Sequence, residues 1–355
     1  MSSRAPERFA HRRASQARTV RRRRAAAALV VATVAALLIA LIAGGGAGHH
    51  AGKTKVAIGA GGPSGAARSG PAVRVAVAQT GRLPVAIQGA AAAPLGGASV
   101  LLIGGLDQSE ASVTDVIALE RSSARRAGTL STALHDACAS ALGGAVYLFG
   151  GGQQASFSQI LRVASGGAAQ PAGSLPTPAS DVACTTVGGV IYIVGGYTGQ
   201  EPLRTVLAWR PGEAPRVVAS LPKPLRYAAV GQSGGQVMIA GGSSGAQASR
   251  DVYSFNPSTG SVRALARLPY PVTHAAGASI GGSLLVIGGR GAEADTPRRE
   301  VLAVSATGAV STAGVLPQAL SDIAAAQSGE SVILAGGRDR EGRTQSSILT
   351  VTLKR

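Results

Sequence analysis

The stretch VIYIVGG, residues 190–196, consists of five apolar residues followed by a glycine pair, and variants of it recur along the chain. The first glycine of each pair lies at position 104, 150, 195, 241, 288 or 336, so successive copies are 46, 45, 46, 47 and 48 residues apart. Six copies at a nearly constant spacing predict a repeat architecture in which one structural unit is used six times.

Each unit is predicted to hold four β-strands. A second pair of small residues, such as Gly188-Gly189, precedes each apolar run and is typical of a two-residue hairpin turn. A strand of small residues (182–187, VACTTV) precedes that turn. A third strand (206–209, VLAW) and a fourth (215–222, PRVVASLP) follow the polar loop after the glycine pair. Four strands per unit in six units predict an all-β fold, a six-bladed β-propeller.

The two ends of the repeat region are predicted to meet. The last unit stops after its third strand, near Leu353. Residues 73–84 (VRVAVAQTGRLP) match the fourth-strand sequence of residues 262–269 (VRALARLP). We expect this N-terminal strand to complete the sixth blade and close the ring, which would remove the open edge of a linear array. The propeller would then span residues 73–355.

The pattern resembles the Kelch-repeat family. The glycine pairs, Tyr147, Tyr192 and residues 252–260 (VYSFNPSTG) carry the resemblance, which covers about 280 of the 355 residues. Kelch repeats usually have a tryptophan in the fourth strand, whereas Trp209 lies in a predicted third strand. The resemblance implies a propeller built from divergent repeats.

The N-terminal region is predicted to anchor the protein in a membrane. Residues 1–24 contain nine arginines and one glutamate, which is about half of the formal net charge of +17, and we expect a disordered cytoplasmic arm. Residues 25–43 carry no charge and are long enough to cross a bilayer as one transmembrane helix, a signal anchor with the arginines inside. Residues 44–72 are rich in Gly, Ala and Ser and indicate a flexible linker. The alternatives are a cleaved signal peptide, which would give a secreted protein, and nucleic-acid binding by the arginines, which we do not expect.

One column of the repeat predicts a ligand site. The residues six positions after the leucine of each fourth strand are Gly89, Asp136, Asp181, Tyr227, His274 and Asp322. They lie where the chain enters the innermost strand of each blade, so we expect them to converge on one mouth of the central channel. Three carboxylates, a histidine and a tyrosine could bind a cation or the hydroxyl groups of a sugar. The alternative is that an aspartate at this position caps a local turn once per blade.

Two further groups of residues leave alternatives open. Cys138 and Cys184 lie in neighbouring inner strands, but their positions differ by one residue, which favours two buried thiols over a disulfide. The loops of the last two units hold many arginines, nearly balanced by acidic residues, and a salt-bridged face is favoured over an anion-binding patch. The arginines are Arg290, Arg298, Arg299, Arg338, Arg340 and Arg343.

The sequence contains no zinc-type His/Cys spacing, phosphate-binding glycine loop or nucleophile motif, so we expect neither a cofactor nor a metal. Some Kelch-like propellers are copper oxidases, but only His135 and His274 lie in the predicted propeller. We therefore expect a monomeric, membrane-tethered, extracytoplasmic module that binds a protein or a glycan. The alternative, implied by the resemblance, is a carbohydrate-active enzyme such as a sugar isomerase or mutarotase.

Overall fold

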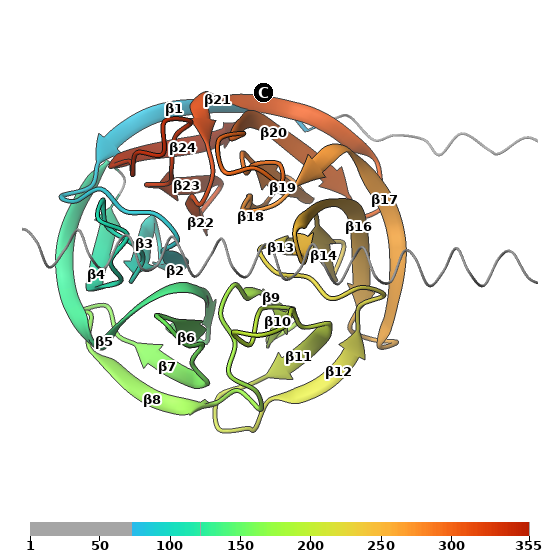
Figure 1. The fold of residues 1–355 in the computed structure, drawn as a ribbon, viewed down its shortest axis with the longest axis horizontal. Helices are drawn as coiled ribbons and strands as arrows, with labels where there is room; N and C mark the ends of the chain where they lie inside the picture. The colour runs from blue at the N-terminus through green and yellow to red at the C-terminus, as the bar shows by residue number, and fades with distance from the viewer. Residues whose placement is uncertain (1–72, 121, 355) are drawn as a thin grey trace, which may run out of the picture. The chain divides into compact units, whose positions relative to one another are not determined.

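Short apolar runs separated by glycine turns form antiparallel strands arranged around a central axis (Figure 1). The structure is a computed structural model that describes residues 73–120 and 122–354, and these residues form an all-β propeller. The predicted arm, transmembrane helix and linker, residues 1–72, lie outside the described residues. Within the described ranges, no helix has the length and apolar character required to span a bilayer.

Four of the six expected sheets are separate. The first contains β9 (Ala183–Val187), β10 (Val190–Val194), β11 (Thr205–Trp209) and β12 (Arg216–Ser220). The second contains β13 (Ala229–Ser233), β14 (Gln236–Ala240), β16 (Gln247–Asn256), β17 (Ser261–Val272) and the short additional strand β15 (Ser243–Ser244). The third contains β18 (Ala276–Ile280), β19 (Ser283–Ile287), β20 (Arg298–Ser305) and β21 (Val310–Leu320). The fourth contains β1 (Val75–Arg82), β22 (Ala324–Ser328), β23 (Ser331–Ala335) and β24 (Ser347–Leu353).

The first two units form one seven-stranded sheet, which differs from the expected pair of four-stranded sheets. The shared strand is β5 (Ser123–Leu142), whose first part pairs with β4 and whose part from His135 onward pairs with β6. Residues 123–142 contain no proline. Proline at this junction does not by itself end a strand, because β17 contains Pro269 and β21 contains Pro317. The remaining strands of this sheet are β2 (Ala91–Gly96), β3 (Ser99–Ile103), β4 (Val113–Glu120), β6 (Ala145–Gly152), β7 (Gln159–Val163) and β8 (Ala169–Ser174).

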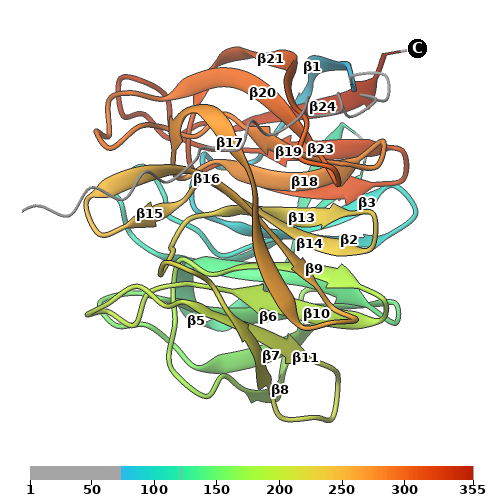
Figure 2. The ribbon, with the colours of Figure 1, turned by 90° about the vertical axis from the view of Figure 1, so that its right-hand side faces the viewer.

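The ring closes as the sequence predicts. The N-terminal strand β1 pairs antiparallel with β24, from Val75 opposite Leu353 to Arg82 opposite Ser347. In the view turned by 90°, β1 lies with β20, β21 and β24 at one edge of the ring, and β7, β8 and β11 lie at the opposite edge (Figure 2). The first strand of the domain therefore completes the sheet formed by its last strands.

Glycine backbones permit the tight turns of each unit. Gly188 and Gly189 have φ values of 57° and 72°, as a primed two-residue hairpin turn requires. Gly195 ends the apolar run at φ 61°, where an added Cβ would overlap the carbonyl oxygen of Leu225. Gly195 is therefore required by close packing, whereas at Gly188 and Gly189 only the positive φ favours glycine.

The hydrophobic core lies between neighbouring sheets. One cluster joins Tyr192 and Ala208 of the β9–β12 sheet to Val230 and Phe255 of the next sheet. Trp209 lies in the third strand of its unit, as predicted, and is fully buried. Its ring contacts Tyr147 and Phe149 of the preceding unit at centroid distances of 4.8 and 5.2 Å. Apolar contacts therefore hold each sheet against its neighbours.

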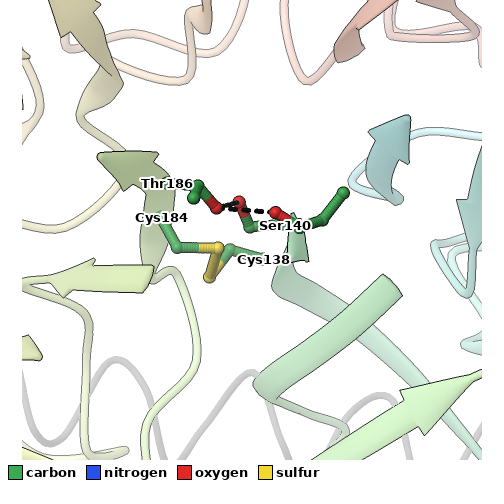
Figure 3. Close-up of a disulfide and its surroundings, with 5 residues drawn as sticks. Cys138, Ser140, Cys184 and Thr186 are labelled. Atoms are coloured by element: carbon green, nitrogen blue, oxygen red, sulfur yellow. Dashed lines mark hydrogen bonds between the residues drawn. A yellow bond between two sulfur atoms is a disulfide. The ribbon is translucent and has the colours of Figure 1, made fainter. Parts of the chain in front are cut away.

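The prediction of two free thiols is wrong, because Cys138 and Cys184 form a disulfide with a Cα–Cα distance of 5.8 Å (Figure 3). Alternate residues of an inner strand face opposite neighbours. A side chain of β5 that points toward the next sheet therefore meets a side chain of β9 that points toward the preceding sheet. Because these two side chains lie on opposite faces of their strands, their positions in the repeat differ by one residue. The hydroxyls of Ser140 and Thr186, offset in the same way, lie 2.8 Å apart beside the disulfide.

Candidate functional site

The structure brings all five predicted site residues to one end of the central channel. Asp136, Asp181, Tyr227, His274 and Asp322, together with Gly89, line a cavity of about 120 Å³ at this end. We call these six residues the mouth ring. The cavity leads outward to a wider hollow of about 290 Å³ that includes His135, Arg290 and Arg338.

Backbone hydrogen bonds connect the members of the mouth ring across the sheets. The amide of Asp181 donates to the carbonyl of Asp136 at 2.7 Å, and the amide of Tyr227 donates to the carbonyl of Asp181 at 3.1 Å. Equivalent hydrogen bonds run from the amide of Asp136 to the carbonyl of Gly89, from the amide of Gly89 to the carbonyl of Asp322, and from the amide of Asp322 to the carbonyl of His274. All six residues adopt left-handed backbone conformations, with φ between 53° and 60°. This shared conformation orients six equivalent positions toward one axis.

The carboxyl groups of the mouth ring bond across the channel or to neighbouring side chains. Among the described residues, none of them accepts a hydrogen bond from a backbone amide, as the alternative of a local turn cap would require. Tyr227 donates its hydroxyl to Oδ2 of Asp136 at 2.9 Å, although these residues are 91 positions apart. Asp181 forms an ion pair with Arg226 at 2.6 Å. Asp322 accepts a hydrogen bond from the hydroxyl of Ser321 at 2.5 Å. The three carboxyl groups thus belong to one polar network at the mouth.

Burial shifts the protonation equilibria of this network. Burial, together with the charges of Asp181 and Asp322, raises the pKa of Asp136 well above its usual value. Burial also raises the pKa of Asp322 and of Asp181, although Arg226 opposes the shift at Asp181. Burial therefore makes these carboxyl groups harder to ionise than a free aspartate, whereas the ion pair with Arg226 favours the charged form of Asp181.

His274 is a neutral member of the network. Burial, with the charges of Arg290 and Arg226, lowers the pKa of His274 to about 2. Its ring stacks on Tyr227 at a centroid distance of 3.6 Å and an interplanar angle of 25°. Nε2 lies 3.0 Å from Nη2 of Arg290, and Nδ1 lies 3.1 Å from the hydroxyl of Thr273. Since Arg290 can only donate, Nε2 accepts this hydrogen bond and Nδ1 carries the proton.

Sequence reasoning missed a second layer of residues around the mouth ring. Residues immediately before the ring positions form isolated bridges with residues immediately after the glycine pairs, as in Ser180 with Tyr197 and Thr273 with Arg290. This layer contributes Arg226, whose guanidinium lies 4.2 Å from the ring of Tyr197 and 4.6 Å from the ring of Tyr227. These two columns are as regular in the sequence as the mouth ring and could have been found by the same alignment of units.

The arginines of the last two units do not form one salt-bridged face. Arg343 pairs with Asp339 and Glu341, which fits the prediction. Arg338 instead pairs with Glu110 of the first unit, and Arg299 donates to the carbonyl of Leu316. Arg298 lies over the ring of Tyr270, and Arg290 contacts His274. Their surroundings therefore differ, and only some of these side chains have carboxylate partners among the described residues.

The comparisons with known proteins agree with this geometry. The Kelch motif matches residues 178–213 and 224–269. The chain therefore contains Kelch motifs within a β-propeller. A solved structure titled "Structure of YjhT" has a TM-score of 0.67 to this propeller and is 14% identical, and the match covers 77% of this chain and 99% of that one. At this identity, the likeness shows the fold alone. No curated protein matches the sequence. In the described part of the chain, no group of three or more His, Cys, Asp or Glu side chains could hold a metal ion.

Proposed function

We propose that this protein is a membrane-tethered, extracytoplasmic binding module that holds part of a glycan in the mouth of its propeller. The observation that carries the proposal is the convergence of Asp136, Asp181, Tyr227, His274 and Asp322 on a single cavity. Carboxyl groups, a tyrosine hydroxyl and an imidazole offer donors and acceptors for sugar hydroxyls. A cavity of about 120 Å³ can hold one end of a glycan but is too small for a longer segment of it.

We infer six blades for this module. The six glycine-pair repeats and the six positions of the mouth ring support that count. The seven-stranded sheet contributes two blades that share β5, since β5 pairs with β4 and with β6 through different parts of its length.

The uncharged apolar stretch of residues 25–43 supports the proposed tether, and the disulfide supports placement outside the cytoplasm. Disulfides form and persist in oxidising compartments and are rare in the cytosol. The Cys138–Cys184 disulfide fits a propeller on the outer side of a membrane, with the arginine-rich arm of residues 1–24 on the inner side.

A substitution of Asp322 tests the proposed site. The full-length protein in detergent is applied to an immobilised panel of neutral and acidic oligosaccharides, and the best ligand is measured by titration. We expect Asp322→Asn to weaken binding at least tenfold, because its amide cannot provide the same pattern of donors and acceptors as a carboxyl group. Asparagine tolerates the left-handed backbone at this position. The matched control is Glu330→Gln, which lies at a turn between β22 and β23.

Both variants must retain the wild-type circular dichroism spectrum and unfolding midpoint. Unchanged affinity in Asp322→Asn would contradict the proposed site. The absence of any bound glycan on the panel would contradict a glycan ligand and leave a protein partner as the ligand to seek by crosslinking.

A second candidate function is the interconversion of sugar anomers. Mutarotation needs an acid to protonate the ring oxygen and a base to accept the proton of the anomeric hydroxyl, and both protons return when the ring closes again. Asp136, whose pKa is raised by burial, could supply the acid, and Asp181, which pairs with Arg226 and lines the same cavity, could supply the base. Faster equilibration of α and β anomers by NMR, lost in Asp136→Asn, would favour this enzyme over a binding module.

A further inference from the structure

Arg290 occupies a fixed position beside the mouth ring. It directly follows the glycine pair Gly288-Gly289, and its backbone forms two hydrogen bonds of 2.8 Å with Thr273. This bridge holds its side chain next to His274, where Nη2 lies 3.0 Å from Nε2 of the imidazole. The backbone of the repeat therefore presents the guanidinium at the entrance to the cavity.

Arg290 differs from the other two arginines at the mouth in having no carboxylate partner. Arg226 pairs with Asp181 at 2.6 Å, and Arg338 pairs with Glu110 at 3.2 Å. Among the described residues, no carboxylate oxygen lies within 4.0 Å of the Arg290 guanidinium. Its remaining contact is a long one, 3.5 Å from Nη1 to the carbonyl of Ala292. The positive charge of Arg290 is therefore left without an ion-pair partner.

Space for a ligand adjoins this side chain on two sides. Arg290 lines the hollow of about 290 Å³ above the mouth ring and a second hollow of about 280 Å³ that it shares with Arg226 and Ser243. The guanidinium fork of arginine matches the geometry of a carboxylate or a phosphate, which can accept two parallel hydrogen bonds. An anionic group could reach Arg290 here without entering the narrow cavity below.

The neighbouring side chains are compatible with an anion. His274 remains neutral, because burial and the arginine charges lower its pKa to about 2, so it does not repel Arg290. Oδ1 of Asp322 lies 4.0 Å from Nε2 of His274. Burial raises the pKa of this carboxyl group, while the hydrogen bond from Ser321 and the charges of Arg290 and Arg338 act against that rise.

We propose that Arg290 forms an anion subsite at the propeller mouth, so that the ligand of the proposed glycan site carries a carboxylate or phosphate group beside its hydroxyls. This inference rests on the proposed function, because it assigns the chemical class of the ligand at the same mouth. It predicts that an acidic sugar binds more tightly than its neutral counterpart, and that Arg290 accounts for the difference.

The test is an NMR titration of the full-length protein in detergent, followed through the ring signals of His274. The probes are glucuronate, glucose as its neutral match, and inorganic phosphate as an anion without a sugar. We expect glucuronate or phosphate to shift the His274 signals with at least tenfold higher affinity than glucose. Arg290→Gln should remove that preference, and Arg340→Gln, an exposed charge in the next unit, should retain it.

The outcomes separate this inference from the proposed function. A response to glucose that equals or exceeds the response to both anions would overturn the anion subsite and leave glycan binding intact. A response to phosphate alone would support the subsite, point to a phosphorylated ligand and argue against a sugar acid. No response to either anion, or a preference that survives Arg290→Gln, would overturn the subsite.

Discussion

The side chains of the mouth ring are held in a backbone conformation that most residues avoid. Tyr227 has φ 53° and His274 has φ 54°, which costs roughly 1 kcal/mol or more for a side chain with a Cβ. Hydrogen bonds between neighbouring units offset this cost, as between the amide of Tyr227 and the carbonyl of Asp181. The same geometry is satisfied by glycine at position 89, so the retention of larger polar side chains in the other units fits a role in binding.

His274 gives the mouth a measurable dependence on pH. The pKa of His274 is about 2 in the folded protein and about 6.5 in an unfolded chain, so the unfolded state binds more protons below pH 6.5. The stability that the neutral imidazole contributes is therefore present above pH 6.5 and is lost as the pH falls toward 2. Between pH 7 and pH 5 this loss amounts to about 2 kcal/mol.

Chemical denaturation at pH 7 and pH 5 measures this loss in the wild type and in His274→Asn. The raised pKa values of Asp136, Asp181 and Asp322 have the opposite effect, giving stability at low pH that is lost as the pH rises. These aspartates are present in both proteins, so the difference between the two losses of stability measures the contribution of His274. An identical dependence on pH in both proteins would show that the imidazole is not buried in its neutral form.

Sequence reasoning located the residues of the mouth ring but not their contacts. The register of the repeat fixes which residue of each unit approaches the axis, and that register is visible in the spacing of the glycine pairs. The contact between Tyr227 and Asp136 joins units that are not neighbours in the chain, so no local pattern could predict it. The pairing of Arg226 with Asp181 likewise depends on the bridge between neighbouring loops.

At the scale of the elements, the inner strands β5 and β9 combine two kinds of link between sheets. Asp136 of β5 and Asp181, two residues before β9, contribute a backbone hydrogen bond at the mouth, and Cys138 and Cys184 contribute the disulfide two and three residues further along the chain. The prediction of free thiols was wrong because it assumed that bonded cysteines must occupy equivalent positions in the repeat, on the same face of their strands. Strands of neighbouring sheets present opposite faces to each other, and an offset of one position therefore brings the sulfur atoms together.

Removing the disulfide should lower stability substantially. The two cysteines are 46 residues apart, and closing a loop of that length corresponds to about 4 kcal/mol in the chain-entropy model. We expect Cys138→Ala/Cys184→Ala to unfold at a lower denaturant concentration than the wild type. Wild type treated with dithiothreitol should approach the variant, and the variant should not respond to the reductant. A wild-type midpoint that dithiothreitol leaves unchanged would indicate that the disulfide contributes no stability.

At the scale of the whole molecule, a single strand pairing closes the ring. Val75 of β1 is buried in the cluster formed by β18–β24, where it packs against Gly314 of β21. The match between residues 73–84 and the fourth strands of other units was sufficient to predict this closure. The joining of two units through β5 was not predicted, because it depends on the continuation of one strand from its pairing with β4 into its pairing with β6 and not on any feature of the repeat.

A charge at Val75 should open this closure. Val75→Asp would bury an unpaired carboxylate, at a cost of about 3 kcal/mol or more, and expose the edge of β24. Val217→Asp is a matched control, because Val217 lies in the outer strand β12 with its surface 59% exposed. We expect a lower unfolding midpoint and concentration-dependent light scattering for the first variant only. Equal midpoints for the two variants would show that the pairing of β1 does not limit stability.

The position of β1 also determines where mechanical load enters the propeller. Residues 1–72 connect directly to this strand, so tension along the predicted membrane tether would reach the ring first at the β1–β24 pairing. Load applied along paired strands shears several backbone hydrogen bonds at once, whereas load across them separates the bonds one by one. The direction of pull relative to β1 therefore sets whether the ring resists a stretched tether or opens under it.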